Sequence, residues 1–177
     1  NLFTDTSFDD QKYSVMSYSQ DSNVGAWIDG EYVFSISSTP SLLDITALQY
    51  LYGSQETTNL GDTTYTFDND LPFAEAIWDA GVNDNDVLDF SNFTTDLIVS
   101  LEPGTSSTIP TTIPTGTWEM TDNLGIAEGA IIENVIAGSG DDKIIGNTED
   151  NVLTGGTGAD IFEFTAGFGS DTITDFL

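Results

Sequence analysis

Residues 137–163 read AGSGDDKII GNTEDNVLT GGTGADIFE, which are three units of nine residues aligned without a gap. Each unit begins with Gly or Ala, carries Asp or Asn at its sixth position and has an apolar residue at its eighth. A looser unit, GFGSDTITDF, follows at residues 167–176. A fixed period of this kind is typical of a chain that coils, with one structural unit per repeat.

Nine residues suit a turn of six residues followed by a strand of three, so that two units complete one coil of a parallel β-roll. Asp142 and Asp160 are 18 positions apart, which places them in successive turns along one edge of the coil. The eighth-position residues Ile144, Leu153 and Phe162 should then point into a narrow core between two sheets. The predicted fold is mainly β, a parallel β-roll preceded by a short subdomain with one α-helix.

The charge of the chain is strongly negative. Thirty acidic residues stand against two lysines and no arginine, giving a formal net charge of −28. Such a chain repels nucleic acid and anionic membranes and attracts cations. Disorder is the first alternative, but 38% of the residues are hydrophobic, 11% are aromatic, and the apolar positions are regularly patterned. A fold that needs cations is the better interpretation, although a saline habitat also favours such a surface.

Calcium fits the repeat chemically, because it takes about six to eight oxygens from carboxylates and backbone carbonyls. Glycine lets a turn aim its carbonyls inward. Without an ion, the stacked aspartates would repel one another. The units resemble the nonapeptide G-G-x-G-x-D-x-U-x of RTX calcium-binding rolls. Acidic surface turns are the alternative, but three copies in phase favour calcium sites. The chain also lacks cysteine, so calcium rather than a disulfide is the expected staple.

Upstream of the repeat the sequence predicts one amphipathic helix over residues 40–52. Thr39 is the expected N-cap, Pro40 the first helical residue and Gly53 the C-terminal stop. The expected apolar face consists of Leu43, Ala47, Leu48 and Leu51.

Short β-type runs follow the helix, separated by Asp, Asn and Gly clusters. A Thr-, Ser- and Pro-rich segment at 102–117 is interpreted as a loop or insertion. The expected strands lie within residues 63–67, 73–78, 87–90 and 96–101.

A series of motifs occurs in a particular order: SVMSY, TPSLLDITALQYLYG, GDTTYTFD, IWDAGVNDNDVLDFS, IAEGAIIENVIAGSGDDKIIGN and the nonapeptides. This order resembles the serralysin family of secreted bacterial zinc metalloproteases (metzincins), from the Met-turn into the calcium roll. The resemblance implies that residues 1–54 are the C-terminal part of a metzincin protease domain. Residues 55–177 would be an RTX β-roll, truncated at its C-terminal end.

The resemblance assigns Met16 to the turn beneath the zinc ligands and Tyr18 to zinc binding and transition-state stabilisation. The family's three zinc histidines and catalytic glutamate lie upstream of the Met-turn, whereas this chain has no histidine. It is therefore expected to be inactive alone. It is either a C-terminal piece of a longer enzyme or a relative without the catalytic half, and the missing segments at both ends favour the first.

The resemblance also assigns calcium ligands. The loop 79–86 is two residues longer than the usual pattern, so Asp86 can replace Asp84, and Val82 stands where a glycine is usual. Asn151 supplies a neutral oxygen, so its site should be weaker. The expected ligands are Asn59 (main chain), Gly61, Thr63, Asp79, Gly81, Asp84 or Asp86, Glu133, Gly138, Gly140, Asp142, Asn147, Glu149, Asn151, Gly156, Gly158, Asp160 and Asp171.

Two functions remain in competition at this point. The first is part of a secreted zinc endopeptidase that binds several calcium ions and, when complete, one zinc ion. The second is a non-catalytic RTX adhesin or surface-layer module. The Met-turn and the helix favour the first, since an adhesin has no use for them. The expected partners are the upstream catalytic segment of the same protein and protein substrates. The chain is expected to be an extracellular monomer, exported by bacterial type I secretion, that binds no nucleic acid and inserts in no membrane.

Overall fold

The computed structural model describes residues 25–28, 31–34, 39–82, 84–113, 116–118 and 120–176. Within these residues there is one α-helix, and no helix has the length and apolar character that crossing a membrane requires. The elements are β1 (Gly25–Ile28), β2 (Glu31–Phe34), α1 (Leu42–Tyr52), β3 (Thr64–Thr66), β4 (Glu75–Ile77), β5 (Val87–Asp89), β6 (Ile98–Ser100), β7 (Ser106–Ser107), β8 (Thr111–Ile113), β9 (Gly116–Trp118), β10 (Leu124–Ile126), β11 (Asn134–Ile136), β12 (Lys143–Ile145), β13 (Val152–Thr154), β14 (Ile161–Glu163) and β15 (Thr172–Ile173).

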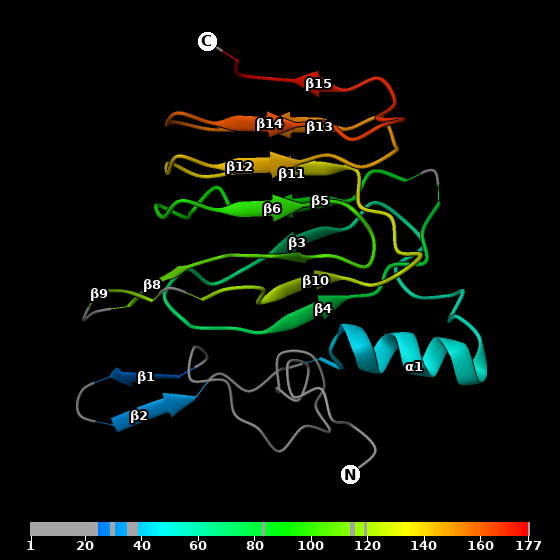
Figure 1. Cartoon of the computed structure of the whole chain (residues 1–177), viewed down its shortest axis with the longest axis horizontal. Coiled ribbons are helices and arrows are strands. Elements are labelled where there is room, and N and C mark those ends of the chain that lie inside the picture. The colour runs from blue at the N-terminus through cyan, green and yellow to red at the C-terminus, as the bar shows by residue number, and fades with distance from the viewer. Residues whose placement is uncertain are drawn as a thin grey trace.

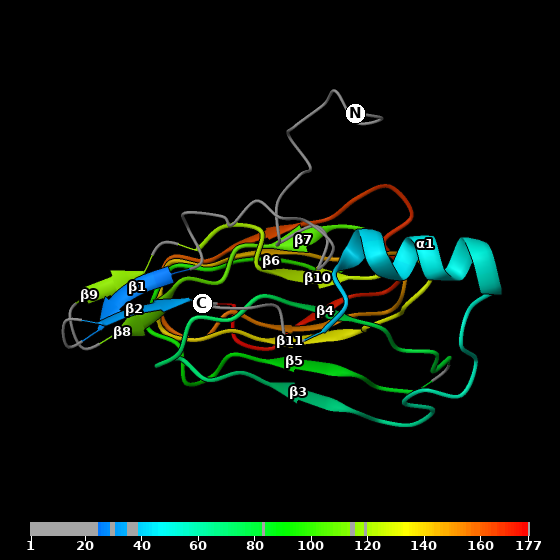
Figure 2. The same ribbon diagram turned by 90° about the horizontal axis from the view of Figure 1, so that it is seen from below.

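From β3 onward the chain coils between two walls of short strands (Figures 1 and 2). The first wall is a parallel sheet in the order β15-β13-β11-β5-β3. The second wall contains the parallel sheet β14-β12-β6 and the sheet β4-β10-β7. Turns from the first wall to the second form what we call the first edge, and turns back form the second edge. The predicted parallel architecture is confirmed.

The nonapeptides occupy the positions that the period predicts. Each contributes its last three residues to a strand, as β12, β13 and β14. The side chains of Ile144 and Leu153 are fully buried, and Phe162 packs against the same hydrophobic core. Because the inward residue recurs every nine positions, one apolar side chain per unit fills the space between the walls. The four strands predicted upstream of the insertion are also present, as β3 to β6.

The Thr- and Pro-rich segment does more than form a loop. β7 runs antiparallel to β10, and Ile98 and Thr108 exchange two backbone hydrogen bonds that join this segment to β6. The side chain of Asn123 accepts from the Ile109 N–H and donates to the Ile109 carbonyl, which holds the start of β10 against the insertion. The insertion thus makes the second wall continuous, and β8 and β9 pair as a hairpin beside it.

The helix is present, but it begins at Leu42 rather than at Pro40, and its predicted N-cap is wrong. Its N-cap is Ser41, whose N–H and hydroxyl both donate to the Asp44 carboxylate; Thr39 instead accepts a hydrogen bond from the Ala76 N–H. Gly53 ends the helix with φ of +83°, as predicted.

The predicted apolar face of α1 is exposed to 44% at Leu43, 49% at Leu48 and 66% at Leu51. Contact with the second wall is made instead by Leu42, which lies against Gly125, and by Gln49, whose amide donates to the Glu128 carbonyl. The spacing rule failed because this helix has apolar residues on more than one face, so periodicity alone did not select the face that contacts the second wall.

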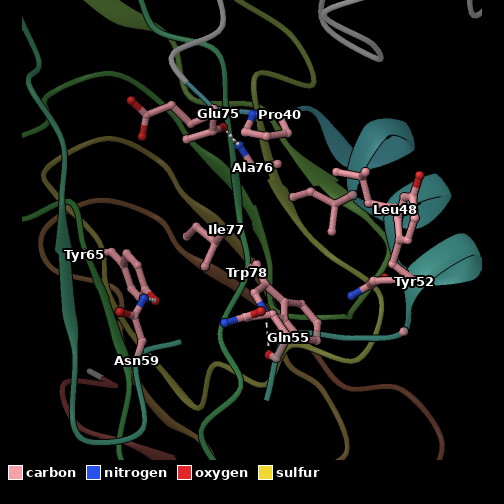
Figure 3. A pocket seen from close by; sticks show the side chains of 14 residues that line it. Pro40, Leu48, Tyr52, Gln55, Asn59, Tyr65, Glu75, Ala76, Ile77 and Trp78 are labelled. Carbon is pink, nitrogen blue, oxygen red and sulfur yellow. Dashed lines mark hydrogen bonds between the residues drawn. The ribbon is translucent and has the colours of Figure 1, made fainter. Parts of the chain in front are cut away.

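A cavity of about 580 Å³ opens between α1, β4 and the start of the first wall (Figure 3). Its lining is mostly apolar and includes Leu48, Tyr52, Tyr65, Ile77 and Trp78. The Trp78 indole donates a hydrogen bond to the Gln55 carbonyl, which ties the segment after the helix to β4.

Candidate functional site

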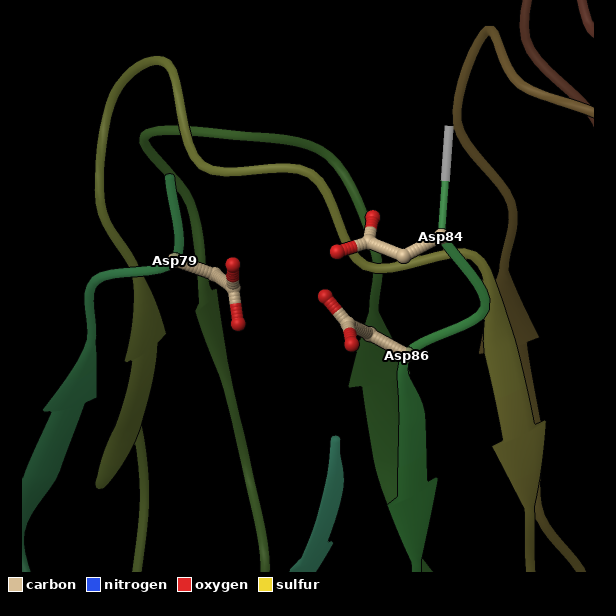
Figure 4. Close-up of side chains that lie close together, drawn as sticks. All are labelled: Asp79, Asp84 and Asp86. Atoms are coloured by element: carbon tan, nitrogen blue, oxygen red, sulfur yellow. The ribbon is translucent and has the colours of Figure 1, made fainter. Parts of the chain in front are cut away.

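Three carboxylates converge in the second-edge loop between β4 and β5 (Figure 4). One oxygen from each of Asp79, Asp84 and Asp86 lies within 4.8 Å of the others. Asp79 and Asp86 are 0% exposed. Two of the three carboxylates therefore lie entirely out of water, which is an arrangement that proteins rarely keep without a compensating charge.

The backbone fixes the positions of these side chains. Asp79 Oδ1 accepts from the Gly81 N–H at 2.7 Å, and Asp86 Oδ1 accepts from the Thr63 N–H at 2.7 Å. The Asp86 N–H donates in turn to Glu133 Oε2 at 2.8 Å. A Cβ at Gly81 would overlap the Asp84 carboxylate, so a larger residue here would have to displace that side chain from the cluster. Two expected ligand segments, 59–63 and 79–86, do come together here, with Glu133 beside them.

Several oxygens of this cluster have no hydrogen-bond donor among the described residues. They are both carboxylate oxygens of Asp84 and Oδ2 of Asp86. Lys143 does not serve the cluster, since it pairs with Glu163 at 2.7 Å. Burial, followed by the nearby Asp79, Asp84 and Glu133 charges, raises the pKa of Asp86 to about 7 despite the bond from Thr63, and burial also raises the pKa of Glu133. Unpaired buried carboxylate oxygens are the donor set that a hard cation such as calcium prefers.

Tyr65 is a member of the cluster that the sequence analysis missed. Its hydroxyl donates to Asp79 Oδ2 at 2.6 Å and accepts from the Asn59 amide at 2.8 Å. Burial and the bond to Asp79 raise the pKa of the Tyr65 hydroxyl. Asn59, expected to act through its main chain, thus reaches the cluster through its side chain. The sequence signal was weak, because an aromatic residue in a short strand is ordinarily a core residue.

The repeat turns on the first edge carry a ladder of carboxylates. Asp142 Oδ1 accepts from the Leu97 N–H at 2.8 Å, and Asp160 Oδ1 accepts from the Asp142 N–H at 3.0 Å. The predicted stacking of Asp142 over Asp160 in successive coils is confirmed. Burial raises the pKa of Asp142 to about 6, against bonds from Leu97 and Gly138 that lower it.

The glycines of these turns are required by close approach. A Cβ at Gly138 would overlap the Phe93 carbonyl oxygen, and a Cβ at Gly156, whose φ is +90°, would overlap the Gly138 carbonyl oxygen. In the same way, a Cβ at Gly140 would overlap the Thr95 carbonyl oxygen, and a Cβ at Gly158 would overlap the Gly140 carbonyl oxygen. Main-chain oxygens therefore line the space between successive turns, next to Asp142 and Asp160, and such oxygens are calcium ligands.

A second ladder uses the fifth position of the repeat and was also missed. Asp96 Oδ1 accepts from the Asp141 N–H, and Asp141 Oδ1 accepts from the Ala159 N–H. On the second edge, Asp62 accepts in the same way from Asn85, and Asp150 from Ser170. The sequence signal that could have predicted this ladder was the pair of acidic residues at positions five and six of the repeat, as in Asp141 and Asp142.

The turn at residues 146–151 differs from its neighbours. Asn147 and Asn151 are 2% and 1% exposed and hydrogen-bond to each other, and the Glu149 N–H donates to Asn147 Oδ1. Asp171 Oδ1 accepts from the Asn151 N–H, while its Oδ2 has no partner in the described part of the chain. Met16 and Tyr18, the residues expected near zinc, lie outside the described residues.

Comparison with known proteins bears on the whole of this region. The model of the peptidase M10 serralysin C-terminal family matches residues 43–177. Serralysin of Proteus mirabilis is 35% identical over 164 residues, covering 86% of this chain and 30% of that protein. Metallopeptidase AprA of Pseudomonas marginalis is 36% identical and serralysin of Photorhabdus luminescens 38%, covering 82% and 84% of this chain. The chain spans about a third of the length of these relatives, 30% or 31% of each.

Proposed function

The chain belongs to the serralysin C-terminal family, and on that premise we propose that it is the C-terminal segment of a secreted, serralysin-like zinc metalloendopeptidase. In this proposal the two-walled coil is an RTX β-roll that calcium holds folded. The names of the relatives, serralysin and metallopeptidase, support the enzyme class. The proposal extends to an extracellular monomer that reaches the medium by type I secretion.

One observation carries the calcium part of the proposal: the carboxylates of Asp79, Asp84 and Asp86 converge with unpartnered oxygens in a chain of net charge −28. A bound calcium ion would supply the positive charge that these groups lack. The proposed ligands are these three aspartates, with Glu133 beside them and main-chain oxygens from the arm at 59–63.

On the first edge we propose calcium between the turns of successive coils. Asp142 and Asp160 would each provide a carboxylate, and Gly138, Gly140, Gly156 and Gly158 would provide main-chain oxygens. The close approach of Gly156 to the Gly138 carbonyl supports this assignment, because it leaves the oxygens facing the gap between turns. Asp171, with one unpartnered oxygen, is a candidate ligand at the last turn of the second edge.

The zinc part of the proposal rests on the family and the sequence. Residues 1–54 would complete a protease domain, with Met16 beneath the zinc site and Tyr18 near the reacting carbonyl of a protein substrate. A chain without histidine offers none of the imidazole ligands that zinc endopeptidases use. The upstream segment of the same protein would provide them. Zinc-dependent proteolysis by the verified 177-residue chain alone would refute the proposal that the upstream segment provides the zinc ligands.

Calcium removal tests the central claim. In chelator, residues from about 130 onward should lose β-structure, because the narrow core offers about 1.5–3 kcal/mol per large side chain against about 1–2 kcal/mol of backbone entropy for each residue ordered. At a calcium concentration of about a hundred times Kd, each site returns about 2.7 kcal/mol, so folding should recover cooperatively at millimolar calcium.

Circular dichroism, amide exchange and a count of bound ions by native mass spectrometry give the readout. Magnesium is the matched control and should substitute poorly, because its octahedral shell tolerates an irregular carbonyl cage less well. Helix α1 should respond less than the coil. Amides of the coil that are equally protected with calcium and with chelator would contradict the proposal.

A further inference from the structure

The turn at residues 146–151, on the second edge, departs in composition from the two nonapeptide turns before and after it in the sequence, which lie on the first edge. Positions two and four are Gly138 and Gly140 in one neighbour and Gly156 and Gly158 in the other, but Asn147 and Glu149 here. The sixth position is Asn151, where the neighbours have aspartate. In the glycine turns, main-chain oxygens face the gap between coils, whereas here the Asn147 side chain, 2% exposed, lies inside the turn.

The orientation of the Asn147 amide follows from its partners. Its nitrogen lies 2.8 Å from the Ile132 carbonyl oxygen and 3.2 Å from the Leu101 carbonyl oxygen. Carbonyl oxygens only accept hydrogen bonds, so the Nδ2 atom must face them. Asn147 Oδ1 then faces the other way and accepts from the Glu149 N–H at 3.0 Å.

The orientation of Asn151 follows in turn. Its side chain approaches Asn147 Oδ1 at 2.8 Å and must present its NH₂ group there. Its own Oδ1 accepts from the Asn147 N–H at 3.0 Å. Asn147 Oδ1 thus has two donors, and the Asn151 Oδ1 atom is engaged as well. An aspartate at position 151 could not donate the bond to Asn147, which gives a physical reason for asparagine here.

We infer that Asn147 and Asn151 form an amide latch that holds this second-edge turn without a cation. Hydrogen bonding alone does not distinguish this turn, because both carboxylate oxygens of Asp142 also accept backbone N–H groups. The difference is that a cation here would find neutral amides in place of a carboxylate and would meet the positive end of the Asn151 NH₂ dipole. The latch connects turns, as an ion would, because the Asn147 amide donates to the carbonyls of Leu101 and Ile132, which belong to other turns of the coil. The inference rests on the proposed calcium binding of the other nonapeptide turns, and it removes the side chains of Asn147 and Asn151 from the ligand set.

The test compares two sixth-position variants of the full chain in saturating calcium, Asn151→Ala and its matched control Asp142→Ala, nine residues earlier. Native mass spectrometry counts the bound calcium ions, and hydrogen exchange follows the Asn147 N–H. Asp142→Ala should bind fewer ions than the wild type. Asn151→Ala should bind the same number, while exchange of the Asn147 N–H becomes about tenfold faster, because a buried hydrogen bond is lost.

A calcium ion lost from Asn151→Ala would overturn the latch, and so would exchange at Asn147 that stays at the wild-type rate. If Asp142→Ala loses no ion, the proposed calcium function of that turn fails, and exchange at Asn147 still decides the latch. Should Asn151→Ala not fold, Asn151→Ser, which retains a small polar side chain, is judged on the same two readouts.

Discussion

The loop that carries Asp79, Asp84 and Asp86 and the turns that carry Asp142 and Asp160 bury carboxylates in different ways. In the loop the carboxylates face one another, and three of their oxygens have no donor in the described structure. In the turns each carboxylate accepts a backbone N–H from the adjacent coil. Under the calcium proposal, the loop cluster would depend on the ion for its charge balance, whereas the turn carboxylates are partly balanced by N–H groups of the coil itself.

The largest effect is expected when one carboxylate of the loop cluster is neutralised. Asp86→Asn should lower the free energy of unfolding in calcium by about 3–5 kcal/mol, the cost of breaking a buried charge pair. In chelator the same change should stabilise the chain, because Oδ1 can still accept from Thr63 and the new amide can donate to the unpartnered oxygens of Asp84. Urea unfolding with and without calcium measures both values.

Glu56→Gln is the matched control for this change, since it removes a charge from an exposed side chain and should alter neither value appreciably. If Asp86→Asn destabilised the chain in chelator as well as in calcium, the loop cluster would not differ from the turns in its dependence on a cation.

The next largest effect concerns pH. Folding raises the pKa of Asp142 to about 6 and that of Asp86 to about 7, from an ordinary 3.8. Both carboxyls hold their protons more tightly in the folded chain, so their contribution to stability is present below about pH 4 and is lost as the pH rises through 6 and 7. In calcium-free buffer the folded coil should therefore be less stable at pH 8 than at pH 5, with Asp142 accounting for about 1.4 kcal/mol, since only the last pKa unit of its shift lies above pH 5.

Calcium should reverse this slope, because the ion binds the deprotonated carboxylates. Circular dichroism of the coil in calcium-free buffer at several pH values measures the effect, because protonation of these carboxyls at low pH should restore part of the β-structure, and Asp142→Asn should flatten the calcium-free profile. Stability that rises with pH in calcium-free buffer would show that the bonds from the neighbouring coils outweigh the burial of these groups.

The smallest effect is the coupling within the ladder. Asp142→Ala and Asp160→Ala should be non-additive by about 1–2 kcal/mol in calcium, since either change deprives the same proposed ion of a carboxylate and breaks the same chain of hydrogen bonds. Paired with Asp68→Ala, outside the repeat, Asp142→Ala should simply add. Equal additivity in the two double-mutant cycles would mean that the ladder residues act singly.

The repeat could be predicted from sequence because its information is periodic. A nine-residue spacing fixes which residue turns inward, so the burial of Ile144 and Leu153 and the stacking of Asp142 over Asp160 followed from counting. The loop cluster required a resemblance to bring Asp79 and Asp84 together, and no spacing rule could add Tyr65, which lies on β3 in the first wall and bonds to Asp79 after β4 in the second.

The failures have a common physical cause. Leu42 rather than Leu43 faces the second wall because tertiary contacts, not periodicity, chose between two apolar faces of α1. Under the inferred amide latch, the expected ligand role of Asn147 would differ for the same reason, because position in a repeat does not distinguish a backbone carbonyl from a side-chain amide. In each case the outcome depended on which partner stood opposite, and that partner came from a distant part of the chain.

The insertion has a geometric consequence for the opposite end of the molecule. Between β4 and β6 the second wall contains two additional strands, β10 and β7, while β3 and β5 are direct neighbours in the first wall (Figure 1). Strands are about 4.8 Å apart, so the second wall is about 10 Å longer than the first over this stretch. The two walls therefore end at different heights along the coil, and β4 lies beyond β3 at this end. The cavity beside α1 is lined both by β4 residues and by Tyr65 of β3, so it lies where the two walls end at different heights.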